Sequence, residues 1–286
     1  MTKSKLARRQ AWRHGIIYLL AVAAAHAAIP GSERQVLLNL YTNTNGPKWI
    51  NSSGWNGAAG TECMWFGVTC DGAQSHVTSI ELASNNLSGP LPSLAPLTNI
   101  ENFDVDTNQL TGAIPPLIDL TNLGNFLVFN NQLTGNIPAI AGLTQLSYFY
   151  IYNNKLTGSI PDLSNLPTLC HFNLSANQLS GNIPAVTQLS SLVVFNVSSN
   201  QLTGSIPALT GLSGLSLFNV GRNKLTGAVP AAPSPNSLVA GGSGFCPNPL
   251  TMTANTDWNT ATGYAPWWAV PDPTNQCDDL FIDGFE

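Results

Sequence analysis

Two carboxylates, Asp104 and Asp106, are the residues with the clearest capacity for chemistry in this sequence. Residues two apart on a strand face the same way, about 6.5–7 Å from each other, which is close to the separation of the carboxyl pair in an inverting glycosidase. Acid–base catalysis also requires an environment that raises the pKa of one member. The flanking sequence predicts an open strand surface with nothing to raise it, so we expect these carboxylates to serve binding rather than catalysis.

Cys170 and His171 are adjacent and form a second candidate pair, for a nucleophile or a metal site. Adjacent residues on a strand point to opposite faces of the sheet, so the pair is poorly placed for either role. Cys170 is therefore expected to be a free, partly buried thiol. The chain lacks G-x-S-x-G, H-E-x-x-H and a phosphate-binding glycine loop. We predict a non-enzymatic protein that needs no metal ion and no cofactor.

The elements that position these residues come from a 23-residue repeat. Asparagine recurs at this interval seven times with no insertion: Asn85, Asn108, Asn131, Asn154, Asn177, Asn200 and Asn223. In every repeat Leu follows this Asn by two residues, Gly by four and Pro by seven. Five residues before the Asn stands Ile80 in the first repeat and then six phenylalanines: Phe103, Phe126, Phe149, Phe172, Phe195 and Phe218. A fixed period of this length indicates a solenoid in which each repeat forms one coil.

Each position of the repeat has a physical role on such a coil. The residues five and three before the Asn share one strand face and point into the core. Coils stacked about 4.8 Å apart would then place the phenylalanines in one column. The Asn follows the strand, where the chain turns inward, and its amide can satisfy backbone groups of neighbouring coils. We therefore expect these asparagines to be structural rather than ligand-binding.

The repeat L-x-x-L-x-L-x-x-N-x-L with its added L-x-G-x-I-P half, as in residues 201–207, resembles the plant-type leucine-rich repeat. The resemblance covers residues 77–230, and each unit is one residue shorter than the usual plant-type unit. It implies a right-handed superhelical solenoid of seven 23-residue repeats with a concave parallel β-sheet and disulfide-bonded caps. Plant-type repeats often form the outer part of receptor kinases, but this chain lacks the signatures of a kinase domain.

A solenoid exposes apolar surface at both ends and requires caps. Residues 28–76 are expected to form the N-terminal cap, because residues 33–41 have helical apolar spacing and residues 63–70 are similar to the cap signature C-x-W-x-G-V-x-C. This similarity implies a disulfide between Cys63 and Cys70 in an exported protein. Residues 231–286 are expected to comprise a linker, a C-terminal cap closed by a bridge between Cys246 and Cys277, and an acidic tail.

The first residues and the charge balance predict an exported protein. Residues 1–27 combine five basic residues, a short apolar run and Ala25-His26-Ala27, which is the order of a cleaved signal peptide. No run of about 18 apolar residues follows residue 30, so the mature chain is expected to have no membrane span. Without the signal peptide, five basic residues remain against 15 acidic ones, which argues against a nucleic-acid partner. We therefore expect a secreted, extracellular protein.

The residues six, four and two before each Asn are expected to line the concave face of the sheet. The first coils are acidic there, the middle coils aromatic, and the last coils small and polar. The candidate binding residues are Asp104, Asp106, Leu127, Phe129, Tyr148, Tyr150, Tyr152, His171, Asn173 and Asn196. Exposed aromatic patches mark binding sites and Tyr is enriched in interface hot spots, so a protein or peptide partner is predicted. The alternative is recognition of an extracellular polysaccharide, or inhibition of an enzyme that degrades one; the oligomeric state stays open.

Overall fold

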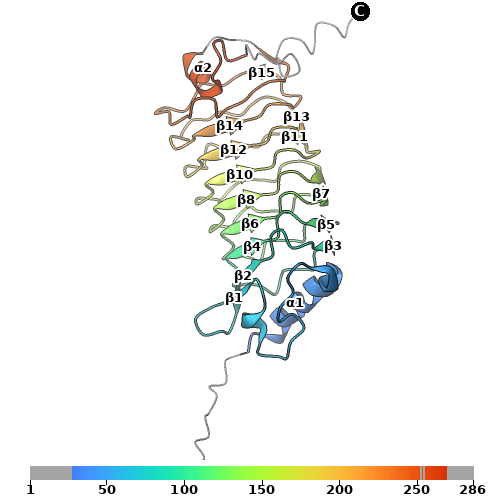
Figure 1. The fold of residues 1–286 in the computed structure, drawn as a ribbon. Coiled ribbons are helices and arrows are strands. Elements are labelled where there is room, and N and C mark those ends of the chain that lie inside the picture. The colour runs from blue at the N-terminus through green and yellow to red at the C-terminus, as the bar shows by residue number, and fades with distance from the viewer. Residues whose placement is uncertain (1–27, 252, 254, 269–286) are drawn as a thin grey trace, which may run out of the picture.

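The computed structural model describes residues 28–251, 253 and 255–268. The chain winds into an elongated stack of coils with a cap at each end (Figure 1). The predicted signal peptide (1–27), Cys277 and the acidic tail lie outside the described residues. Among the residues that are described, no helix is both long and apolar enough to cross a membrane.

One eight-stranded sheet runs along the whole stack and forms the concave face. Its strands, in spatial order, are β1 (Val68–Cys70), β2 (Val77–Glu81), β4 (Asn102–Asp104), β6 (Asn125–Leu127), β8 (Tyr148–Tyr150), β10 (His171–Asn173), β12 (Val194–Asn196) and β14 (Leu217–Asn219). β1 is antiparallel to β2, whereas every later pair is parallel and joins residues 23 apart, such as Phe126 with Phe149. The expected concave parallel sheet is thus present, and its register repeats the period of the sequence.

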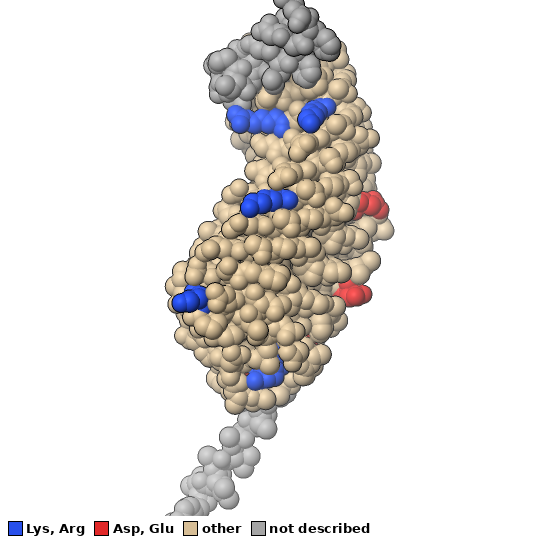
Figure 2. Space-filling view, turned by 90° about the vertical axis from the view of Figure 1, so that its right-hand side faces the viewer, with Lys and Arg blue, Asp and Glu red and all other residues tan. Residues whose placement is uncertain are grey.

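A second, interrupted layer of short strands follows each turn on another side of the stack (Figure 1). Parallel pairs form between β3 (Ser88–Pro90) and β5 (Gln109–Thr111), β7 (Thr134–Asn136) and β9 (Lys155–Thr157), β11 (Ser180–Asn182) and β13 (Gln201–Thr203), and β15 (Gly227–Ala228) and β16 (Leu250–Thr251). Figure 2 views the molecule from this side, where most of the surface is uncharged and Lys and Arg outnumber Asp and Glu. We call it the lateral face.

The six phenylalanines form one buried column behind the concave sheet. Their rings stack coil on coil, with centroids 5.6 Å apart for Phe103–Phe126, 5.7 Å for Phe126–Phe149 and 5.4 Å for Phe195–Phe218. Each ring is fully buried. This Phe spine confirms which strand face points into the core, and offset stacking adds to the free energy gained from burial alone.

The repeated asparagines form a second internal column at the end of each strand. Asn131 is representative: its Nδ2 donates to the carbonyl oxygens of Val105 (3.1 Å), Val128 (3.2 Å) and Phe129 (3.1 Å), and its Oδ1 accepts from the N–H of Leu110 (2.9 Å). One amide thus satisfies backbone groups of two adjacent coils, which would otherwise be buried without partners. The structural role expected for these residues is confirmed.

The residue before each of these asparagines has an unusual backbone. All seven have φ between +51° and +55°: Ser84, Thr107, Asn130, Asn153, Ala176, Ser199 and Arg222. This left-handed region costs free energy for residues other than Gly, Asn and Asp. The sharp turn that sends the Asn inward therefore imposes the conformation on whatever residue stands there.

The N-terminal cap is built around helix α1 (Gly31–Asn43), which includes the predicted helical segment, and two single 3₁₀ turns, η1 (Gly46–Lys48) and η2 (Glu62–Met64). The predicted disulfide between Cys63 and Cys70 is present. Buried Glu33 ties the helix to the first repeat, because its carboxylate accepts from the N–H of Val77 (2.8 Å) and lies 2.6 Å from Nδ1 of His76.

The stacking continues past residue 230, where the sequence pattern ends. After an irregular stretch, Gly244 pairs with Asn219 of β14, and its carbonyl oxygen accepts from the N–H of Val220 (2.8 Å). Asn248 then takes the place of a repeat asparagine, donating to the carbonyl oxygen of Val220 (2.9 Å) and accepting from the N–H of Leu225 (2.9 Å). The linker expected at the start of residues 231–286 therefore leads into an eighth coil.

Helix α2 (Thr256–Thr262) closes the C-terminal end and was not predicted. Asn255 caps it by accepting from the N–H groups of Asp257 and Trp258. Trp258 and Trp267 are buried against the last coil, so these rings are part of the C-terminal cap. Cys246 is disulfide-bonded, while Cys277, its expected partner, lies outside the described residues.

Candidate binding surface

The parallel register brings all ten candidate residues to one side of the concave sheet. Residues four before each Asn form one row, in which Asp104 pairs with Leu127, Leu127 with Tyr150, Tyr150 with Asn173 and Asn173 with Asn196. Asp106, Phe129 and Tyr152 occupy the neighbouring row, and Tyr148 and His171 the row on the other side. The sequence period alone thus set which candidates share a surface.

The aromatic patch, defined as Leu127, Phe129, Tyr148, Tyr150 and Tyr152, forms continuous ring contacts in the middle of this surface. Phe129 and Tyr152 stack with centroids 4.5 Å apart and an interplanar angle of 11°. Tyr148 and Tyr150 meet edge to face at 6.1 Å. These side chains are half-buried, except that Tyr148 is exposed. The patch therefore has open ring faces, although neighbouring rings support one another.

His171 extends the patch by one coil and fixes the position of Tyr150. Its Nδ1 lies 2.6 Å from Oη of Tyr150, and its ring lies 4.7 Å from that of Tyr148. Burial raises the pKa of Tyr150 and lowers the pKa of His171, so both groups are uncharged at neutral pH. A hydrogen bond between two neutral rings holds the surface in one arrangement before any partner arrives, which reduces the entropy lost on binding.

The acidic end, defined as Glu81, Asp104 and Asp106, adjoins the aromatic patch. Glu81 accepts from the hydroxyl of Ser79 and Nδ2 of Asn102, both at 3.0 Å. Asp104 accepts from the N–H of Asp106 (3.1 Å). Burial, together with the negative charges of Asp106 and Glu81, raises the pKa of Asp104 to about 6. The expectation that nothing would raise either carboxyl's pKa is therefore wrong, because the neighbouring side chains cover this strand more than the sequence suggested.

Asn173 and Asn196 are less free to bind a ligand than the sequence suggested. The Oδ1 of Asn173 accepts from the N–H (3.0 Å) and hydroxyl (2.7 Å) of Ser175, and Asn196 makes the same pair of bonds to Ser198. Each amide oxygen therefore closes a local turn at the end of its strand. Only the amide nitrogens remain without a hydrogen bond inside the described chain, so they can act as donors to a ligand.

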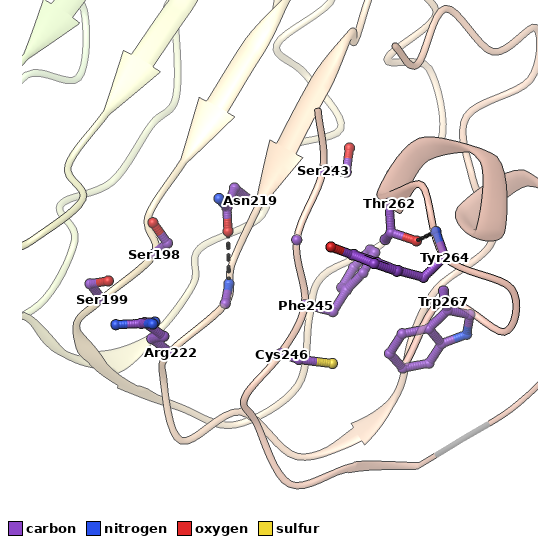
Figure 3. Close-up of a pocket in the computed structure, with 12 residues that line it drawn as sticks. Ser198, Ser199, Asn219, Arg222, Ser243, Phe245, Cys246, Thr262, Tyr264 and Trp267 are labelled. Carbon is purple, nitrogen blue, oxygen red and sulfur yellow. Dashed lines mark hydrogen bonds between the residues drawn. The ribbon is translucent and has the colours of Figure 1, made fainter. Parts of the chain in front are cut away.

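Sequence reasoning missed a small hollow where the last coils meet the C-terminal cap (Figure 3). It encloses about 240 Å³ and is lined by residues including Ser198, Asn219, Arg222, Tyr264 and Trp267. None of the ten candidate residues lines it. Periodicity could not reveal it, because the cap residues come from a segment outside the repeat. Among the described residues no cluster of His, Cys, Asp and Glu could hold a metal ion.

Several known proteins are similar to this chain in sequence. The family model of the leucine rich repeat N-terminal domain matches residues 30–71. The receptor-like protein kinase HSL1 of Arabidopsis thaliana is 43% identical over 54 residues, which are 18% of this chain and 5% of that protein. A probable leucine-rich repeat receptor-like protein kinase of the same plant is 34% identical over 94 residues, or 30% of this chain and 8% of its own length. The matched segments are therefore small parts of both relatives.

Solved structures match over much more of the chain. The structure of PEPR1–AtPEP1 has a TM-score of 0.62 and 27% identity, and the alignment covers 82% of this chain and 37% of that one. A plant ice-binding protein has a TM-score of 0.51 over 88% of this chain and 99% of its own, but at 19% identity this likeness concerns the fold alone. Together with the repeat and the disulfide-bonded N-terminal cap, these matches identify the chain as a plant-type leucine-rich repeat protein.

Proposed function

We propose that this chain is an exported binding module that recognises a protein or peptide on the concave face of its solenoid. The aromatic patch carries the proposal. The Phe spine already fills the core of the same coils, so the fold does not require Phe129, Tyr148, Tyr150 or Tyr152 on the opposite strand face. A cluster of half-exposed, mutually supported aromatic rings is the arrangement that binding hot spots favour.

Two further observations support this proposal. The structure of PEPR1–AtPEP1, which shares the fold over 82% of this chain, contains PEPR1 together with AtPEP1. The disulfide between Cys63 and Cys70 suits an oxidising compartment outside the cytosol. The leucine-rich repeat solenoid is a binding-module fold that is typically non-catalytic. The raised pKa of Asp104 follows from its burial and from the nearby charges of Asp106 and Glu81, and it does not by itself indicate acid catalysis.

A second candidate is recognition of an extracellular polysaccharide, or inhibition of an enzyme that degrades one. The exposed ring of Tyr148 and the free amide nitrogens of Asn173 and Asn196 favour it, because flat rings and amide donors suit sugar faces and hydroxyls. Recognition of a polysaccharide assigns no role to the acidic end. We therefore keep the peptide as the first candidate.

The test presents the same protein with both ligand classes. A random peptide library displayed on phage and an array of plant and microbial glycans would be screened with the parent chain and with Tyr150→Ala/Tyr152→Ala. We expect peptides that lose about 2 kcal/mol of binding free energy in this double variant. The control, Gln178→Ala/Gln201→Ala, changes exposed residues of the lateral face and should bind like the parent. Ligands that bind the tyrosine variant as tightly as the parent would contradict the proposal, and glycans alone would favour the second candidate.

A further inference from the structure

Charge is unevenly distributed around the solenoid. The three rows of the concave face contain no Lys or Arg, whereas these residues show on the lateral face (Figure 2). The ion pairs that join two described residues are Arg34–Glu62 and His76–Glu33, and both lie in the N-terminal cap. No cationic side chain of the described chain therefore neutralises Glu81, Asp104 and Asp106. The acidic end is a concentration of negative charge beside an apolar surface.

The acidic end and the aromatic patch meet along one row. Asp106, Phe129 and Tyr152 take the same position in successive coils, and backbone bonds from Thr107 to Phe129 (2.9 Å) and from Asn130 to Tyr152 (3.0 Å) hold those coils together. Neighbouring coils are about 4.8 Å apart, so the Asp106 carboxylate lies one rung from the stacked Phe129–Tyr152 pair. The charge of Asp106 contributes, after burial, to the raised pKa of Tyr152, which shows that ring and carboxylate share one electrostatic environment.

A flat cation is the group that fits this junction best. The guanidinium of arginine can stack on an aromatic face and at the same time donate a pair of hydrogen bonds to a carboxylate. The ammonium of lysine is a compact point charge with no plane to stack. Arginine also keeps its charge when partly desolvated against rings.

We propose that the concave face recognises an arginine side chain of its peptide partner, with the guanidinium against the Phe129–Tyr152 pair and hydrogen-bonded to Asp104 and Asp106. The inference rests on the proposed function, because it assigns one residue of that partner. It also gives the acidic end and the adjoining rings one shared role, which neither has in the fold itself.

Binding of this cation is coupled to protons. Asp104 has a pKa of about 6 because it is buried and because Glu81 of β2 and Asp106 are negatively charged. The facing residues on β6 and after it, namely Asn125, Leu127 and Phe129, do not titrate. A guanidinium favours the carboxylate form of Asp104, so a proton is released on binding below about pH 6. Affinity therefore rises as the pH increases from about 5 to 7.

The test uses peptides selected from the phage library on the parent chain after subtraction on Tyr150→Ala/Tyr152→Ala. Synthetic copies with arginine replaced by lysine or by neutral citrulline are compared by isothermal titration calorimetry. We expect arginine to be enriched, lysine to bind about tenfold more weakly and citrulline more weakly still. Asp104→Asn/Asp106→Asn should lose about tenfold in affinity and remove the preference for arginine over lysine.

The matched control is Asp119→Asn/Asp162→Asn, which removes the same charge at exposed sites between β5 and β6 and between β9 and β10. It should bind within about twofold of the parent, since exposed charges away from the interface are screened. If the selected peptides need the tyrosines but lack arginine, or bind equally well with lysine, this inference is overturned while the proposed function stands. If no peptide distinguishes the parent from the tyrosine variant, the proposed function falls and this inference with it.

Discussion

The Phe spine and the aromatic patch are made by the same strands, one residue apart, yet they differ in regularity. The spine repeats in six consecutive coils, whereas the patch occupies only the two coils of β6 and β8. Stacking forces regularity on the buried face, because a ring that fits one coil must fit the next. The exposed face carries no such requirement. A local departure from the period on that face is therefore better explained by a partner than by the fold.

The largest expected effect is a loss of stability when the buried Phe spine is interrupted. Phe149 packs between Phe126 at 5.7 Å and Phe172 at 5.8 Å, and Phe149→Ala leaves a cavity that neighbouring coils cannot close. We expect a loss of about 3–5 kcal/mol in the free energy of unfolding, measured by denaturant titration. Tyr150→Ala, on the next residue but the opposite face, should lose only about 1 kcal/mol. Equal losses would mean that the assignment of the two faces is reversed.

Buried and concave-face asparagines should differ in their effect on stability in the same way as Phe149 and Tyr150. Asn200 is buried and bonds to the carbonyl oxygens of Leu174, Val197 and Ser198 and to the N–H of Leu179, so Asn200→Ala leaves several backbone groups without partners. We expect a loss of about 2–3 kcal/mol. Asn196→Ala, four residues earlier, removes only a local turn on the concave face and should lose less than about 1 kcal/mol. Thermal unfolding of the two variants with matched buffers would measure the difference, and similar losses would show that the inward Asn column is not what holds the coils together.

The periodic repeats of the molecule could be predicted from the sequence, whereas its aperiodic C-terminal end could not. The 23-residue period sufficed to assign the Phe spine, the inward Asn column and the shared surface of the ten candidates, because stacking converts sequence spacing directly into spatial position. The eighth coil escaped prediction since Asn248 follows Asn223 by 25 residues instead of 23. Helix α2 and the hollow beside it belong to this aperiodic end, where no repeat guides the assignment.

The side-chain geometry on the concave face could not be predicted from the sequence either. The bond between Tyr150 and His171 depends on the rotamers of both rings, and the turns closed by Asn173 and Asn196 depend on where their amides point. The positive φ of Thr107 could not be foreseen either, because the β-branched side chain of Thr disfavours it. In each case the tertiary stack, and not local preference, decides the conformation.

The smallest expected effect, and the one that separates fold from function most directly, concerns Asp104. Its pKa in the folded chain is about 6, above the ordinary value of 3.8, because burial and the nearby Asp106 and Glu81 disfavour its charge. Between about pH 4 and 6 the folded state therefore holds a proton that the unfolded state has released, so stability falls as the pH rises through this range and the penalty is complete above it. Asp104→Asn should remove the penalty and stabilise the chain by about 1 kcal/mol at pH 7, after allowance for partial solvent screening, with almost no effect at pH 4.

The fold itself offers the control for this substitution. Asparagine already stands at the equivalent position in β10, β12 and β14, where its side-chain oxygen accepts the same backbone N–H two residues on that Asp104 accepts from Asp106. Asp104→Asn thus preserves the turn and changes only the charge. Urea titrations of parent and variant at pH 4 and pH 7 would measure the effect. A variant that is less stable than its parent at pH 7 would show that the surroundings of Asp104 do not destabilise its carboxylate. Asp104→Asn could both stabilise the chain and weaken its binding of an arginine peptide. This combination would mean that the negative charge of Asp104 lowers the stability of the fold and contributes to recognition, as expected of a residue retained for function.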